Sequence, residues 1–222
     1  MKHTESLRNS DNVAAVAAAA AGARSEASIR RTKCIVMTGM LGAISFILML
    51  FELPMFFVPG FIKMDFSELP IMIGGFLMGP VWGSIVALLK IVLKLIFKGT
   101  STGGVGELAN LAGALCYVLP ASLIYGRNKS RKSAALGMAV GTVLTSIVMV
   151  LCNTFVTFPL YMRLFQMDEA MIVGMTQQVN PLASNMLTVM LFSILPFNLF
   201  KFGVVSVITM LVYKRISRAV KL

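Results

Sequence analysis

The sequence predicts an all-α integral membrane protein, with six transmembrane helices arranged as a compact bundle. Of its 222 residues, 57% are hydrophobic and only 13% are charged, whereas a soluble domain has about 45–50% apolar and about 25% charged residues. The apolar residues form long unbroken runs without strand-like alternation, which favours helices over a barrel. Lysine and arginine cluster between these runs, as expected of a protein inserted with a fixed orientation.

The chain begins with a polar segment, residues 1–33, which contains an alanine-rich run at 13–23. This run is too weakly hydrophobic to span a membrane, and it lacks the leucine-rich core of a signal peptide. We expect a disordered or marginally helical cytoplasmic tail. The membrane domain then covers residues 34–222, and its first span lies at about 34–51.

The first loop, ELPMFFVPGFIKMDFSELP, contains three prolines and one glycine, which prevent a continuous helix. Because it is rich in Phe, Met and Leu, we expect it to pack over the bundle as a lid. Two helices at 69–79 and 80–97 follow, with a tight turn at Gly79-Pro80. The first is short for a hydrocarbon layer of about 30 Å, so it is expected to be tilted, buried or re-entrant.

Three more spans are predicted at 108–125, 134–161 and 183–213. Of the 20 Lys and Arg residues, six lie in the tail, four in the loop RNKSRK and four after Tyr213. The loops on the other side hold three of these cations and six of the nine acids. By the positive-inside rule both termini are cytoplasmic. Topology and anionic lipid therefore account for the net charge of +11, rather than nucleic acid.

Three polar side chains are predicted to meet within the membrane. Asn198 and Lys201 are three residues apart and so share a helix face, and Asn153 lies at a similar depth in the preceding span. Pro196 frees a backbone carbonyl one turn upstream. Two amides and an ammonium suit a neutral, flat heteroaromatic edge that carries carbonyls and ring nitrogens. The alternative is structural, since Asn can join helices and a lysine can snorkel to the interface.

Lys90, Lys94 and Lys98 recur every four residues and form one stripe on a helix. Lys98 is interfacial, and the other two can snorkel after it. The stripe could instead attract an anionic or hydroxyl-rich solute. Two small-residue pairs, Gly39 with Ala43 and Gly137 with Gly141, create faces that allow close helix packing. For Gly39 with Ala43 the alternative is the docking of another membrane subunit.

Motifs of enzymes and metal sites are missing from the sequence. The loop GTSTGGVGE lacks the Lys-Ser/Thr ending of a P-loop, so the chain has no ATP-hydrolysing site of its own. We find no HExxH and no CxxC, and the single histidine, His3, lies in the tail. No nucleophile–base pair is found in a span, and no Asp, Glu or His is expected deep in one. The sequence predicts neither catalysis nor a metal.

Three segments resemble a known family: DFSELPIMIGGFLMGPVWGSIVALLK, FKGTSTGGVGELANLAGALCYVLPASLIY and CNTFVTFPLY. They are similar to the riboflavin-specific substrate-binding subunit, or S component, of energy-coupling factor (ECF) transporters. The likeness runs from about residue 34 to the end of the chain. The two longer segments are specific, whereas NLFK alone would be weak.

The resemblance implies six helices around an outward-facing pocket in a prokaryotic plasma membrane. It implies riboflavin as the transported substrate, and as partners a membrane-embedded coupling subunit and two cytoplasmic ATPases. By the family pattern Asn153, Asn198 and Lys201 bind the polar edge of the isoalloxazine ring, and the first loop folds over the vitamin. In our interpretation, apolar contacts to the rings come from Leu53, Pro54 and Phe56.

The family's docking motif in the first helix is usually alanine-based, and its nearest match here is Gly39 with Ala43. The lysine stripe also makes binding of the phosphorylated flavin, FMN, plausible. Three alternatives stay open: an S component for another vitamin, a self-sufficient secondary transporter, and a membrane enzyme acting on lipid.

Overall fold

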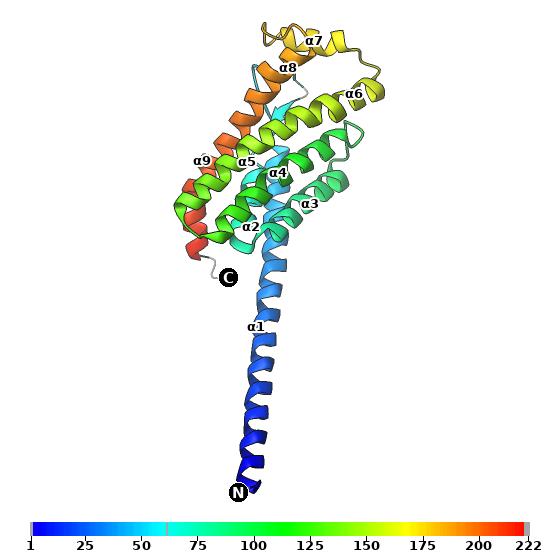
Figure 1. Ribbon diagram of the computed structural model, residues 1–222. Helices are drawn as coiled ribbons and strands as arrows, with labels where there is room; N and C mark the ends of the chain where they lie inside the picture. The colour runs from blue at the N-terminus through cyan, green and yellow to red at the C-terminus, as the bar shows by residue number, and fades with distance from the viewer. Residues whose placement is uncertain (1, 61, 220–222) are drawn as a thin grey trace.

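The computed structural model describes residues 2–60 and 62–219, and within them the chain is mostly helical (Figure 1). Its helices are α1 Lys2–Leu50, α2 Glu68–Met78, α3 Pro80–Phe97, α4 Val105–Arg127, α5 Arg131–Cys152, α6 Phe158–Phe165, α7 Glu169–Gln177, α8 Met186–Val189 and α9 Leu195–Ala219. Two π-helical segments, η1 Asn153–Thr157 and η2 Met190–Ile194, join α5 to α6 and α8 to α9. The prediction of an all-α membrane protein is confirmed.

Five stretches of the described chain are long and apolar enough to cross a membrane. They are Gly22–Leu50, Pro80–Phe97, Val105–Arg127, Arg131–Phe165 and Met186–Tyr213. Helix α2 is apolar but has only 11 residues, about half of the ~20 that a spanning helix needs. Eight of its residues are buried, and it packs against α1, α3, α4 and α9. The structure therefore shows this short helix buried among its neighbours.

Helix α1 runs without interruption from Lys2 to Leu50, and it includes most of the segment expected to be disordered or marginally helical. From residue 22 to residue 33 its side chains are exposed, and burial begins at Cys34. Figure 1 shows this first part of α1 projecting beyond the bundle.

The turn between α2 and α3 lies where the sequence predicts it. Gly79 has φ of 98°, a backbone conformation that an L-residue rarely adopts, and Pro80 occupies the first turn of α3, where its missing N–H costs nothing. The chain therefore reverses within one residue and packs α3 directly against α2.

Close packing of α4 and α5 depends on two glycines. A Cβ added at Gly137 would lie 2.7 Å from the carbonyl oxygen of Ala121, and one at Gly141 would lie 2.8 Å from that of Tyr117. This small-residue face is therefore used inside the bundle, where it lets two helix backbones approach.

Each π-helical segment lies just before a proline. Pro159 follows η1 and Pro196 follows η2, each two residues after the segment ends. Proline cannot donate to the carbonyl four residues earlier, so the turn before it widens easily. The carbonyl oxygen of Phe192, four residues before Pro196, instead accepts a hydrogen bond of 2.9 Å from the Asn180 amide.

A hairpin and α7 lie at the end of the bundle opposite the two chain ends (Figure 1). The hairpin consists of β1 Leu53–Pro54 and β2 Lys63–Met64, paired antiparallel with Leu53 opposite Met64. Val58 and Met64 of this loop pack on Phe197 of α9. The first loop thus lies against the bundle, as its apolar composition predicts.

Candidate functional site

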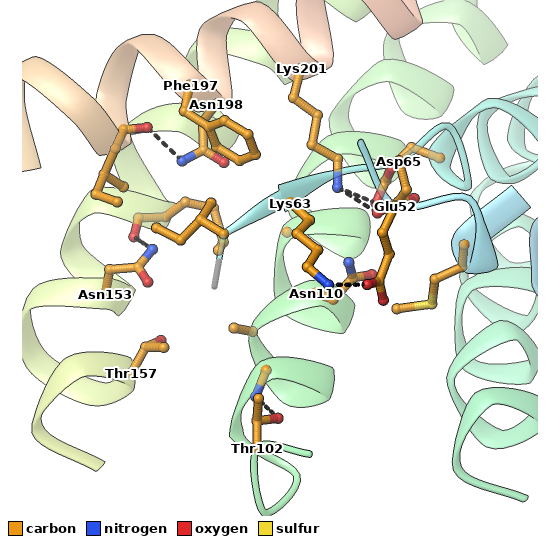
Figure 2. A pocket seen from close by; sticks show the side chains of 18 of the residues that line it. Glu52, Lys63, Asp65, Thr102, Asn110, Asn153, Thr157, Phe197, Asn198 and Lys201 are labelled. Carbon is orange, nitrogen blue, oxygen red and sulfur yellow. Dashed lines mark hydrogen bonds and ion pairs between the residues drawn. The ribbon is translucent and has the colours of Figure 1, made fainter. Parts of the chain in front are cut away.

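A cavity of about 230 Å³ lies among the last turn of α1, the first loop, α4, η1 and α9. In Figure 2, Asn198 and Lys201 extend from α9, Asn153 and Thr157 face them from η1, and Asn110 lies on α4. The walls combine apolar, amide, hydroxyl and charged side chains. The lining residues are Met49, Glu52, Ile62, Lys63, Asp65, Glu68, Lys94, Ser101, Thr102, Gly106, Ala109, Asn110, Gly113, Met149, Asn153, Thr157, Tyr161, Ile194, Phe197, Asn198, Lys201 and Phe202.

The three polar residues expected to meet within the membrane all line this cavity. The Asn153 amide donates to the carbonyl oxygen of Met149 at 2.6 Å, and the Asn198 amide donates to that of Ile194 at 2.8 Å. Among the described residues these are the only hydrogen bonds of the two amide groups. One N–H and the carbonyl oxygen of each amide therefore remain for a ligand.

Lys201 is held by two carboxylates that the sequence analysis did not connect with it. Its Nζ lies 3.2 Å from Oδ2 of Asp65 and 3.3 Å from Oε1 of Glu68, and all three residues are buried. Snorkelling is therefore not what compensates this ammonium. The sequence pattern places Glu68 and Glu107 among the acids of the outer loops, but both lie in the first turn of a helix, α2 and α4, and are almost inaccessible.

Lys90 does not line the cavity and is completely buried, which contradicts snorkelling for this residue. Its Nζ donates to Oδ1 of Asn110 at 2.6 Å and to Oγ of Ser67 at 3.0 Å, and it lies 3.4 Å from Oε1 of Glu68. One carboxylate oxygen of Glu68 therefore serves two ammonium groups. Its other oxygen, Oε2, is buried with no hydrogen-bond partner among the described residues.

Lys94 lines the cavity and forms an ion pair of 2.7 Å with Oε1 of Glu107. The second oxygen of Glu107 accepts hydrogen bonds of 2.9 Å from Thr100 and from Thr102. The glycine- and threonine-rich loop is thus tied to α4 by a carboxylate, an arrangement unlike that of a phosphate cradle.

The three loop residues expected to contact a ligand, Leu53, Pro54 and Phe56, are exposed and do not line the cavity in this structure. Phe56 is 82% exposed. The same loop contributes other residues instead: Glu52, Ile62, Lys63 and Asp65.

Glu52 forms salt bridges with Lys63 at 2.6 Å and with Lys98 at 3.0 Å. Because the Lys63 hydrogen bond is the largest influence, the pKa of Glu52 is lowered from its ordinary value. Burial alone would raise the pKa of Asp65, but the ammonium groups of Lys201 and Lys90 outweigh burial and lower it. Both carboxyl groups are therefore held in the charged form.

Gly39 and Ala43 lie on the exposed side of α1. A Cβ added at Gly39 would meet no atom within 4 Å, whereas one added at Gly42 would meet the side chain of Leu89. The small-residue pair therefore faces away from the bundle. Among the described residues no group of three or more His, Cys, Asp or Glu side chains is placed to hold a metal ion.

The fold and this cavity define an α-helical membrane protein with a polar cavity inside its bundle. The family described as "ECF transporter, substrate-specific component" matches residues 33–213. Because the match covers most of the chain, the chain belongs to this family, whose members are transporter components rather than enzymes.

Individual relatives agree with this assignment. The chain is similar to the riboflavin transporter RibU of Staphylococcus aureus, with 32% identity over 89% of this chain and 97% of the relative. It is also similar to the riboflavin transporter FmnP of Bacillus subtilis, with 29% identity over 84% and 93% of the two chains. A solved structure described as "Structure and mechanism of the S component of a bacterial ECF transporter" aligns with a TM-score of 0.67 and 31% identity, covering 86% of this chain and 99% of that one.

Proposed function

We propose that this chain is the riboflavin-binding S component of an ATP-driven ECF transporter and mediates riboflavin uptake. The observation that carries the proposal is the convergence of Asn153, Asn198 and Lys201 on one cavity. The remaining N–H and carbonyl oxygen of each amide, together with the ammonium, match the alternating acceptors and donor on the pyrimidine edge of a flavin ring. Two relatives named as riboflavin transporters support this choice of ligand.

Apolar side chains complete the proposed site. Met49, Ile194, Phe197 and Phe202 line the cavity and offer surface for the flat rings. Leu53, Pro54 and Phe56 lie on the loop that also supplies cavity residues, so they would reach the ligand only if this loop moved toward it.

We further propose six membrane helices, α2 being the short one, with both termini in the cytoplasm of a prokaryotic cell. The start of α1, the end of α9 and the basic turn between α4 and α5 share one end of the bundle (Figure 1). A basic end favours the cytoplasmic side. The cavity is lined by loops of the other end and would therefore open outward.

A titration of the purified protein with riboflavin, followed by flavin fluorescence, tests the proposed ligand. We expect binding in the sub-micromolar range and none with thiamin, biotin or folate. Lys201→Ala should weaken binding by about 1.5–3 kcal/mol, since a charge-assisted hydrogen bond is lost. Lys129→Ala is the matched control, because Lys129 is exposed and lies in the turn between α4 and α5, at the end of the bundle away from the cavity. Unchanged affinity in Lys201→Ala would overturn the assigned site.

The proposed partners are a membrane-embedded coupling subunit and two cytoplasmic ATPases, docked through the exposed small-residue face of α1. Ala43→Trp should abolish riboflavin uptake by cells that express all the subunits, because a large side chain prevents close helix approach. The purified variant should still bind riboflavin normally. Normal uptake by this variant would rule out docking at that face.

A further inference from the structure

Four charged side chains form one buried cluster beside the cavity, and we call it the four-charge cluster. Its members are Asp65, Glu68, Lys90 and Lys201, and none is more than 6% exposed. They come from the first loop, α2, α3 and α9, so the cluster exists only in the folded bundle.

Charge in the cluster is balanced, with two ammonium groups and two carboxylates. The ion pairs join Lys201 to Asp65 and Glu68, and Lys90 to Glu68, at 3.2–3.4 Å. Burying an isolated charge is costly, and removing any one member would leave one buried charge of the cluster without a counter-charge. Lys201 therefore faces the cavity as a hydrogen-bond donor whose charge is already neutralised.

The charges of the whole cavity lining are also balanced. The lining residues include three lysines, Lys63, Lys94 and Lys201, and three carboxylates, Glu52, Asp65 and Glu68. Within the described residues the lining has no net charge, although the whole protein carries +11. An anionic ligand would thus enter a cavity whose lining supplies no net counter-charge, and burying its charge there would be unfavourable.

We propose that the four-charge cluster determines specificity, by positioning Lys201 as a compensated donor so that the cavity selects an uncharged flavin over its anionic phosphate ester. This inference rests on the proposed riboflavin-binding function. Glu68 and Lys90 act as positioning residues, since Glu68 holds the ammonium of Lys201 and Lys90 balances Glu68 from behind the wall.

The test compares riboflavin with FMN in fluorescence titrations of single variants. The measured quantity is the ratio of the FMN dissociation constant to the riboflavin dissociation constant. Glu68→Gln leaves one net positive charge beside the cavity, so this ratio should fall about tenfold. Lys90→Gln leaves one net negative charge, so the ratio should rise by a similar factor. Asp65→Asn makes the same charge change as Glu68→Gln from the loop and substitutes for it if that variant does not fold.

Glu169→Gln is the matched control, because it removes one acid from the exposed first turn of α7, which does not line the cavity. Because solvent screens this exposed charge, the ratio of the two dissociation constants should be the same in Glu169→Gln as in wild type. A merely structural role of the cluster would weaken both ligands together, without opposite shifts of the ratio. Equal ratios in wild type, Glu68→Gln and Lys90→Gln would overturn the inference, while a wild type that binds no riboflavin would overturn the proposed function instead.

Discussion

Replacing Lys201 by Met should destabilise the protein even without a ligand. At an effective dielectric constant of about 20, an ammonium at 3.2 Å and 3.3 Å from two carboxylates has a gross attraction of about 5 kcal/mol to each. Desolvation offsets much of this, and breaking a buried pair by removing one partner typically costs about 3–5 kcal/mol. We expect a loss of that size in the free energy of unfolding of Lys201→Met.

A double variant separates charge imbalance from lost packing. Adding Glu68→Gln to Lys201→Met leaves one carboxylate, Asp65, and one ammonium, Lys90, so the cluster is balanced again. The double variant should recover about 2 kcal/mol relative to Lys201→Met alone, because neighbouring buried charges are strongly non-additive. The assay is denaturant unfolding of the detergent-solubilised protein without flavin. Equal stability of Lys201→Met and wild type, or a double variant less stable than the single one, would refute the reasoning.

Three further predictions concern the same framework. The pKa of Asp65 is lowered in the folded protein, so its stabilising effect is complete above the ordinary value of 3.8 and is lost as the pH falls through the lower folded value. Thermal stability should therefore drop below about pH 4, and it should drop less in Asp65→Asn. Identical pH profiles of wild type and variant would contradict this. Gly141→Ala should cost about 1–3 kcal/mol of unfolding free energy through overpacking against α4, whereas Gly39→Ala should cost none; equal effects of the two would argue against the helix contact. Glu107→Ala should speed hydrogen exchange at residues 98–104, since their hydroxyl anchors are lost, and unchanged protection would show that the loop is held otherwise.

The helical framework could be predicted from sequence because hydropathy and chain breakers are local signals. The turn at Gly79-Pro80 needs only a residue that tolerates positive φ followed by one that starts a helix well. Three polar residues of the cavity could be predicted from sequence for the same reason. Asn153, Asn198 and Lys201 stand out singly against an apolar background.

The charge partners of these residues could not be found in this way. Asp65 and Lys201 are 136 positions apart, and no local pattern joins them. A signal did exist in the requirement for compensation, because Lys90 and Lys201 within apolar runs demand buried acids, and DFSELP supplies two. Asp65 and Glu68 were counted among the outer-loop acids because that segment reads as an irregular loop. The widened turns before Pro159 and Pro196 were also missed, since a proline predicts a disturbed helix without specifying its form.

The position of the flavin ring in a crystal or cryo-electron microscopy structure of the riboflavin complex tests the central claim most directly. We predict that the pyrimidine edge of the ring lies within hydrogen-bond distance of the Asn153 and Asn198 amides and the Lys201 ammonium. A ring located elsewhere, with these three side chains still bonded only to protein groups, would contradict the account.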